Sequence, residues 1–225
     1  LSYFRQFSSP VIWETDLEVD EMFYIATKET DMFSRWNIFQ SMYKKAIISR
    51  ACNKSDHLLE ELLVDSINKI IKNYRSESFD FIASILTLPP IQEVELSQDP
   101  IDPIAIYNSF RHLMEFIANK LSSSLVNLLE ISKENLYEKW PEGASNRRLT
   151  NAIWGVLVFS KCIDIKEDLV NIIKGNTMTL SLSALNSLKQ IRCKERDIAM
   201  SYFYNRWKDN PLILDTWFSL ESSIC

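Results

Sequence analysis

The chain is 225 residues long, and 46% of its residues are apolar and 24% charged, which is the balance of a folded globular protein and not of a disordered one. The formal net charge is −5, and the largest basic clusters are the pairs Lys44–Lys45 and Arg147–Arg148, so neither a nucleic-acid-binding surface nor a patch for anionic membranes is expected. Glycine occurs only 3 times, where average usage would give roughly 16, and this scarcity favours helices over tight β-hairpins and phosphate-binding loops.

Residues 1–15 differ in character from the rest of the chain. Aromatic and β-branched residues flank Ser8–Pro10, a pattern typical of a strand end followed by a connector. We therefore expect residues 1–15 to be the tail of a preceding β domain or a linker, and residues 16–225 to form a helical domain. No secretory signal is recognisable, and the longest apolar stretch, Ala152–Phe159, is less than half of a membrane span.

Two amphipathic helices are predicted at the start of the helical domain. A short one extends from Asp16 to Ala26. The second has Thr30 or Asp31 as its cap, and its apolar residues step by four, three, four and four positions, which keeps them on one stripe. These residues are Met32, Trp36, Phe39, Tyr43 and Ile47.

Two more helices follow in the sequence. The segment Leu58–Ile71 carries a stripe rich in leucine and isoleucine and is opened by Ser55 or Asp56. The segment Phe79–Leu88 is shorter and is stopped by the two prolines that come directly after it.

The longest segment predicted to be non-helical is Pro89–Asp102. It leads into Asp102-Pro103, an N-cap followed by a proline in the first turn of a helix. The helix that begins there continues toward Leu128. Its apolar stripe consists of Ile106, Phe110, Leu113, Ile117 and Leu121.

The last part of the chain predicts five further helices after a break at Pro141–Gly143. Asp164 with Glu167 resembles a capping box, and Gly175 lies where a C-terminal cap belongs. About ten short helices with tight connections indicate an all-α fold in which antiparallel helix pairs stack into a curved, solenoid-like layer. The five predicted segments are 146–162, 165–174, 180–191, 195–208 and 212–222.

Histidine is too scarce for the usual hydrolytic zinc site. The motif H-E-x-x-H is missing, because the two histidines, His57 and His112, are 55 residues apart. Each is followed three positions later by a glutamate, Glu60 or Glu115, so two His/Glu pairs on helix faces could hold two metal ions in a bundle. Ferritin-like sites use the reverse order and further carboxylates. We therefore expect surface or cap roles and assign no metal ligand.

No catalytic residue is assigned either. Serine nucleophile elbows and phosphate loops need glycines that the chain lacks. Cys52 or Cys162 could meet a histidine only through the tertiary fold, and we expect the cysteines to be free, buried thiols in a reducing cytosol. Glu95, Asp99 and Asp102 lie close together in the sequence, where turn and cap roles are expected.

Large aromatic rings are predicted to supply packing area. Arg35 and Arg206 each precede a tryptophan. They could make cation–π or carboxylate contacts, but the role that we expect is to fix helix–helix geometry. The tryptophans predicted to lie on buried helix faces are Trp36, Trp154, Trp207 and Trp217.

Several short motifs follow one another along nearly the whole chain. Arg5–Val11 is similar to R-x-F-S-A-P-V, and Asp31–Trp36 to D-x-F-x-R-W. Ile85–Pro89 and Asp99–Pro103 match L-T-L-P and D-x-x-D-P. Three later segments also match motifs. Arg148–Ala152 is similar to R-x-L-x-N-A, and Met178–Leu185 to M-T-x-x-L-x-A-L. Arg206–Phe218 is similar to R-W-x-x-x-x-L-v-x-D-x-W-F. In this order the motifs resemble the C-terminal helical region of zinc aminopeptidases of the alanyl aminopeptidase (aminopeptidase N) type, which belong to the gluzincins.

The resemblance implies a non-catalytic role for this segment. In that family the H-E-x-x-H zinc site and the G-A-M-E-N substrate motif lie in an upstream thermolysin-like domain. A β-sandwich follows, of which residues 1–15 would be the last strand. The helical domain covers the active site and shapes a closed chamber for peptide N-termini. The implied partners are the catalytic and β-sandwich domains of the same polypeptide and peptide substrates, with zinc in the parent enzyme, no cofactor in this segment, and a cytoplasmic location.

The chain departs from the family pattern at two places. Leu180 replaces the acidic residue that usually follows the M-T pair, and the chain stops at Cys225 where the family continues with more helices. The resemblance therefore implies a segment truncated at both ends, inactive without its catalytic domain. The alternative is a free-standing α-solenoid scaffold that binds a partner helix or peptide.

Overall fold

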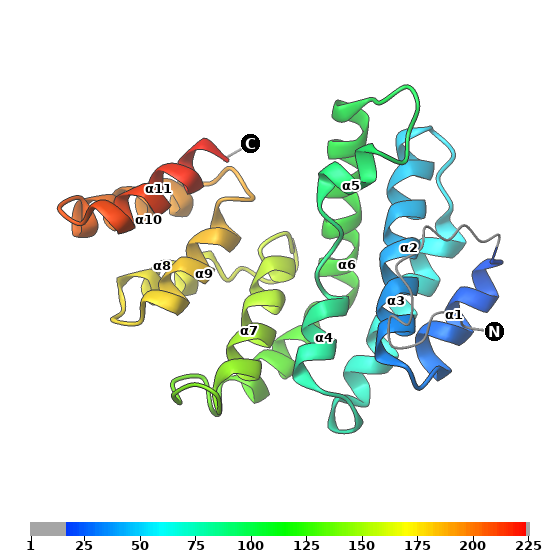
Figure 1. Ribbon diagram of the computed structural model, residues 1–225, viewed down its shortest axis with the longest axis horizontal. Coiled ribbons are helices and arrows are strands. Elements are labelled where there is room, and N and C mark those ends of the chain that lie inside the picture. The colour runs from blue at the N-terminus through cyan, green and yellow to red at the C-terminus, as the bar shows by residue number, and fades with distance from the viewer. Residues whose placement is uncertain (1–16, 224–225) are drawn as a thin grey trace.

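The structure, a computed structural model, describes residues 17–223 and consists of helices stacked side by side in a curved layer (Figure 1). Within these residues it has eleven α-helices and no β-strand. The predicted all-α, solenoid-like fold is confirmed. The strand predicted for residues 1–15 lies outside the described residues.

The helix bounds agree with the predicted segments for most of the chain. The helices are α1 (Val19–Lys28), α2 (Met32–Ala51), α3 (His57–Lys72), α4 (Phe79–Ile85), α5 (Ile91–Glu95), α6 (Pro103–Ser132), α7 (Ala144–Leu157), α8 (Lys166–Lys174), α9 (Met178–Leu188), α10 (Lys194–Trp207) and α11 (Pro211–Ser222).

Side-chain caps explain where several helices begin. The carboxylate of Asp31 accepts the backbone N–H of Ser34 at 2.8 Å, and Asp56 and Asp102 cap α3 and α6 in the same way. Each cap satisfies one of the N–H groups that a helix start leaves without a partner. At the end of α2, Asn53 takes up the left-handed conformation (φ 56°), a place where glycine is more usual. At this one helix end, asparagine takes the place that glycine usually has.

Three sequence predictions need correction. The segment predicted to be non-helical, Pro89–Asp102, contains the short helix α5, because proline is well tolerated just before and in the first helical turn. Asp164 accepts the N–H of Lys166 and forms no capping box with Glu167. Helix α7 ends at Leu157, before the predicted Cys162.

Local hydrogen bonds account for the early end of α7. The hydroxyl of Ser160 accepts the N–H groups of Cys162 and Ile163, and the side chain of Asn119 on α6 accepts the N–H of Lys161 at 2.8 Å. These side chains offer the backbone an alternative to the helical ladder. The turn after α7 is therefore tied to α6.

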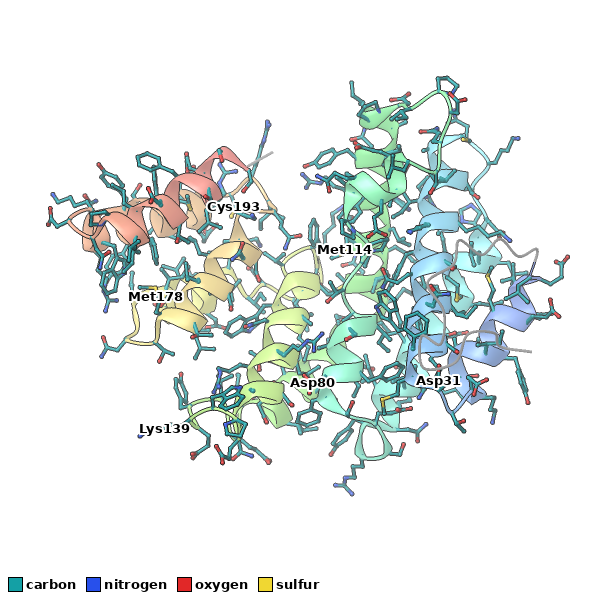
Figure 2. All side chains as sticks on the ribbon, viewed as in Figure 1. Asp31, Asp80, Met114, Lys139, Met178 and Cys193 are labelled. Carbon is teal, nitrogen blue, oxygen red and sulfur yellow. The ribbon has the colours of Figure 1, made fainter. Side chains whose placement is uncertain are left out.

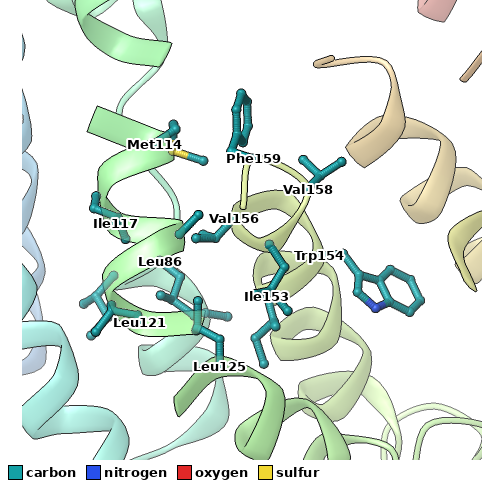
Figure 3. Close-up of a cluster of buried hydrophobic side chains, with 14 of the residues drawn as sticks. Leu86, Met114, Ile117, Leu121, Leu125, Ile153, Trp154, Val156, Val158 and Phe159 are labelled. Carbon is teal, nitrogen blue, oxygen red and sulfur yellow. The ribbon is translucent and has the colours of Figure 1, made fainter. Parts of the chain in front are cut away.

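The layer is organised around the long central helix α6. It contacts α2 and α3 on one side and α7 on the other, while α2, α4, α7 and α9 form a row in which each helix touches the next. Figure 3 shows the apolar cluster between α6 and α7, in which Leu121 and Leu125 face Ile153 and Val156. Leu125 and Ile153 are completely buried, so these two helices are joined mainly by the hydrophobic effect.

An ion pair adds a polar tie between the first helices. Arg35 forms two hydrogen bonds to the carboxylate of Glu77, at 2.9 and 2.7 Å, and donates to the carbonyl of Ala26 at the end of α1. Its guanidinium also lies 4.4 Å from the ring centroid of Phe81. Arg35 therefore fixes helix–helix geometry as predicted.

The predicted aromatic packing is confirmed in part. Trp154 is buried, whereas Trp36, Trp207 and Trp217 are half-buried. Arg206 lies 5.2 Å from the ring centroid of Trp207 and donates to the carbonyls of Lys174 and Gly175 at the end of α8. Gly175 occupies the predicted C-cap position, in an extended conformation.

Candidate functional site

A continuous groove, here called the row groove, follows α2, α4, α7, α9 and the first half of α6. It consists of three adjoining cavities with volumes of about 520, 420 and 100 Å³. The first two share Thr87, Leu88 and Arg148 in their walls, and the last two share Phe110 and Gln190. The three cavities therefore adjoin one another along the row.

A charged pair lies where the first two cavities meet. The Arg148 guanidinium is 3.4 Å from the carboxylate of Asp80 and donates to Ser84 at 3.2 Å, and the Asp80 carboxylate accepts the hydroxyl of Ser145 at 2.7 Å. Figure 2 labels Asp80 on α4 and Met114, which lines the second cavity, on α6. Since the Arg148 side chain is 60% exposed, this pair contributes little to stability.

The α9 wall of the second cavity carries side-chain amides. The amide nitrogens of Asn186, on α9, and Gln190, in the turn after it, donate to backbone carbonyls four residues earlier, at 3.0 and 3.5 Å. Within the described residues, the amide oxygens of these two side chains accept no hydrogen bond. The wall therefore offers acceptors to a ligand.

Asn151, on α7, lines the second cavity, but its side-chain oxygen is turned away from solvent. Its Oδ1 is buried and has no hydrogen-bond partner, a state that only Arg196 Nη1 shares among the buried side-chain polar atoms of residues 17–223. Buried polar atoms are hydrogen-bonded in the large majority of cases, because an unmade bond costs about 1–3 kcal/mol. Asn151 thus needs an N–H or O–H donor.

The third cavity is basic. Arg111 on α6 and Lys189 after α9 both line it, together with the rings of Tyr107 and Phe159. The only hydrogen bonds of the two cations within the described chain go to the Tyr107 hydroxyl, at 3.4 Å, and to the hydroxyl of Ser223, at 3.0 Å. Neither forms an ion pair with a described carboxylate, although acidic residues outnumber basic ones.

Neither histidine lines this groove. His57 is the first residue of α3, with its side chain 82% exposed and its Nδ1 3.7 Å from the Glu60 carboxylate. Both oxygens of Glu60 are already bound by the guanidinium of Arg50, at 2.7 and 2.8 Å. His112 is an exposed residue of α6. In the first His/Glu pair, the Glu60 carboxylate is therefore bound by Arg50 and not by a metal ion.

Metal-binding geometry is not found elsewhere in the described part of the chain. Glu115, the partner of His112 in the sequence, forms an ion pair with Lys161. Across residues 17–223, no three side chains of the His, Cys, Asp or Glu type come together in a way that could hold a metal ion. Over the same range, no helix combines the length and apolarity needed to cross a membrane.

The cysteines correct one prediction and support another. Cys52, Cys162 and Cys193 are free, as expected, but Cys52 and Cys162 are exposed. Both lie in helix connections, where few neighbours cover a small side chain. Partial burial raises the pKa of Cys193, the N-cap residue of α10, so this thiol is less reactive than an ordinary one. Cys225 lies outside the described residues.

The acidic residues of the segment before α6 are structural, and the turn and cap roles predicted for them hold for Asp99 and Asp102 but not for Glu95, which lies in a helix. Asp102 caps α6 by accepting the N–H of Ala105 at 2.9 Å. Asp99 precedes Pro100 in a turn, and Glu95 is the last residue of α5. They do not form a paired-carboxylate site.

Sequence reasoning missed the row groove. Its only local signal is the spacing of Asn186 and Gln190, four positions apart at the end of α9 and in the turn that follows. Asn151 lies inside a family motif but has no sequence feature that marks it as an unpaired acceptor. Arg111 and Lys189 are 78 positions apart and come to line one cavity only because α6 and α9 both pack against α7.

Comparison with known proteins gives the groove a family context. Residues 19–224 match a family described as a domain of unknown function (DUF3458_C) with ARM repeats. Two proteins called aminopeptidase N are each 27% identical to the chain. The one from Caulobacter vibrioides aligns with 98% of this chain and 26% of its own length, and the one from Escherichia coli with 97% and 25%. The chain thus spans about a quarter of the length of these relatives.

A solved structure has the same fold. Legionella pneumophila aminopeptidase A, crystallised with aspartic acid, superposes with a TM-score of 0.82 at 22% identity, over 96% of this chain and 26% of its own. At this identity the likeness concerns the fold.

Proposed function

The chain belongs to the DUF3458_C family of ARM-repeat domains, and from this premise we propose that it is the non-catalytic helical domain of a zinc aminopeptidase that removes N-terminal amino acids from peptides. The observation that carries the proposal is the collinear likeness to two proteins called aminopeptidase N over 97–98% of the chain. The longer relatives have ample length for a catalytic domain outside the matched region.

The proposed role of this domain is to cover and shape the chamber in which peptides are cleaved. A curved layer of stacked helices suits that role, since solenoids present extended concave surfaces. Its proposed partners are the catalytic domain and a β-sandwich domain of the same polypeptide, with residues 1–15 as the end of that sandwich and residues 16–225 as the helical domain. We place the whole protein in the cytoplasm and expect neither a nucleic-acid nor a membrane partner.

Zinc would be held outside this chain. Glu60 is bound by Arg50 and Glu115 by Lys161, so the donor set of the described residues does not fit a catalytic zinc site, which needs three protein ligands. When bound in the parent enzyme, zinc would supply an activated water. This chain would shape the chamber in which peptides are cleaved and limit the access of peptides to it.

The reading frame that encodes the chain provides the direct test. We expect it to encode H-E-x-x-H upstream, and the protein made from the whole frame to hydrolyse alanine p-nitroanilide. The 225-residue chain by itself should bind no stoichiometric zinc and release no p-nitroaniline. Turnover by the pure chain that is inhibited by bestatin would contradict the proposal, as would a frame without the motif, which would favour the free-standing scaffold.

Hydroxyl-radical footprinting tests the covering role. Tyr24, Trp140 and Phe218 are 66%, 80% and 53% exposed in this chain. If other domains pack on the layer, part of these exposed side chains should be labelled more slowly in the whole protein than in the chain alone. Equal labelling in both proteins would argue against a covering role.

A further inference from the structure

The helices of the described chain fall into two groups that are joined at one place. Helices α1–α7 form the first block (residues 19–157), and α8–α11 form the end block (residues 166–222). Figure 1 shows the end block on one side of α7, and the packing of α7 on α9 is the main contact between the two blocks. We propose that this joint is a pivot about which the end block swings, so that the space between α6 and α9 opens and closes. The inference goes beyond the proposed function and does not depend on it.

Side-chain hydrogen bonds fix the position of α7 within the first block. The hydroxyl of Ser145 donates to Asp80 on α4 at 2.7 Å. The hydroxyls of Ser132 on α6 and Thr150 on α7 are 2.7 Å apart, and the Asn146 amide donates to the carbonyl of Ser132 at 3.1 Å. Because hydrogen bonds weaken steeply with distance and angle, these contacts hold α7 in one position against α4 and α6.

The end block has polar contacts of its own between helices. Ser181 of α9 donates to a carbonyl in the last turn of α8 at 3.3 Å. Arg206 of α10 donates to the carbonyl of Gly175, directly after α8, at 2.6 Å. The indole nitrogen of Trp217 on α11 donates to the carbonyl of Met200 on α10 at 3.1 Å. Each helix of the end block is therefore bonded to at least one other helix of the same block.

The joint between α7 and α9 differs from the other two, because no hydrogen bond or ion pair within residues 17–223 links a side chain of α7 to α9. The α9 side chains Ser183, Asn186 and Ser187 donate to carbonyls of their own helix, at 2.8, 3.0 and 3.1 Å. They line the second cavity together with Ala152 and Gly155 of α7. The two faces that border this cavity therefore have no directional bond between them, and packed helices of this kind can slide against each other.

The space beside the joint gives the end block room to move. The second and third cavities, about 420 and 100 Å³ in volume, both have walls from α6 and from α9 or the turn after it. Closing this space would cover Phe110 and Met114 of α6, which removes apolar surface from water. Opening it would give water access to the buried Oδ1 of Asn151, which has no partner in this arrangement. Since each movement brings a gain to set against the contacts that it loses, we expect two arrangements of similar free energy.

The connection between α7 and α8 contains the hinge of the pivot. Its first part stays with the first block, because Asn119 of α6 accepts the N–H of Lys161 at 2.8 Å and the Glu115 carboxylate forms an ion pair with the Lys161 side chain. Its last residue, Ile165, is buried and is the N-cap residue of α8. The hinge therefore lies in the two residues before Ile165, where rotation about a few backbone dihedral angles turns the end block as a unit.

Distances between pairs of spin labels, measured by double electron–electron resonance, test the pivot in the 225-residue chain. The 4 native cysteines are replaced by serine, and the nitroxides are attached at exposed positions. Asn108→Cys on α6 with Asn205→Cys on α10 spans the joint. Lys45→Cys with Asn108→Cys is the control pair within the first block, and Asn171→Cys with Asn205→Cys is the control pair within the end block. An excess of unlabelled chain prevents contributions from associated copies.

The pair that spans the joint should give a distance distribution with two maxima, or one about twice as wide as those of the control pairs, because only this pair reports movement of one block against the other. Both control pairs should give single narrow maxima. Distributions of equal width for all three pairs would overturn the proposal.

A hydrogen bond introduced across the joint tests where the movement occurs. A Cβ built on Gly155 would lie 3.9 Å from Nε2 of Gln190, so the hydroxyl of Gly155→Ser can reach this amide, whereas Gly155→Ala adds a side chain of similar size without the bond. Gly155→Ser should lower the population of the opened arrangement about fivefold, as one hydrogen bond implies. Gly155→Ala is the matched control and should keep the wild-type distribution. Equal distributions for the two variants would place the movement outside this joint and refute the pivot.

Discussion

Several single side chains in this protein join one helix to another, and Tyr43 is a completely buried example. It is completely buried in α2, and its hydroxyl donates to the carbonyl of Ile85 at the end of α4 at 2.5 Å. That carbonyl is one of those that a helix end leaves without an intrahelical partner. Burial raises the pKa of the Tyr43 phenol far above its usual value near 10. The phenol is therefore neutral throughout the folded state.

This raised pKa predicts a loss of stability at high pH. The unfolded chain releases the Tyr43 proton near pH 10 and the folded chain does not, so the contribution of the neutral phenol is complete below pH 10 and declines as the pH rises above it. Between pH 9.5 and 11 the free energy of unfolding should fall by ~1 kcal/mol more for the wild type than for Tyr43→Phe. Urea unfolding at the two pH values measures the difference, and equal losses would refute it.

At the scale of elements, the stacking depends on joints between helices that are distant in sequence. Arg35 of α2 is the clearest joint, since it contacts the end of α1, the carboxylate of Glu77 before α4 and the ring of Phe81. The side chains of Arg35 and Glu77 are only 8% and 13% exposed. Removal of one partner leaves the other charge buried without compensation.

The joint can be tested against an exposed ion pair. Arg35→Met should lower the free energy of unfolding by about 3–5 kcal/mol. Lys120→Met, which breaks the exposed pair between Lys120 and Glu61 (47% and 49% exposed), should cost less than about 1 kcal/mol. Urea unfolding followed by circular dichroism compares them. Similar costs for both variants would show that the Arg35 pair has no special structural role.

For the whole molecule, the predicted resemblance to the C-terminal region of aminopeptidase N is confirmed by the family match and by the relatives that share it. The isolated layer also exposes large apolar side chains. Leu96 before α6, Trp140 before α7 and Leu212 in α11 are 84%, 80% and 81% exposed, and they lie on separate parts of the layer. In the proposed enzyme other domains would cover side chains of this kind, which the isolated chain leaves in water.

The exposed apolar surface predicts self-association of the isolated chain. Static light scattering should give an apparent mass that rises with protein concentration and falls on dilution. Leu212→Ser should weaken the association more than Ser201→Ala, an exposed change on α10 that removes no apolar surface. A constant monomer mass at all concentrations would contradict the prediction.

The sequence by itself determined most of the helices, the N-caps of α2, α3 and α6, and the family. Apolar stripes such as Met32 to Ile47 and caps such as Asp31 and Asp102 depend on neighbours within one or two turns, so local pattern specifies them. Short breaks were harder to predict: α5 lies between prolines, and α7 is ended by the side chain of Asn119, which belongs to another helix.

The residues that line the row groove could be identified only from the tertiary structure. Asn151, Arg111 and Lys189 come from α7, α6 and the end of α9, and only helix stacking brings them to one set of adjoining cavities. Whether a polar atom finds a partner is a property of the folded surroundings, so the unpaired oxygen of Asn151 leaves no trace in the local sequence. The exposure of Cys52 and Cys162 was likewise set by where the helix connections lie in space.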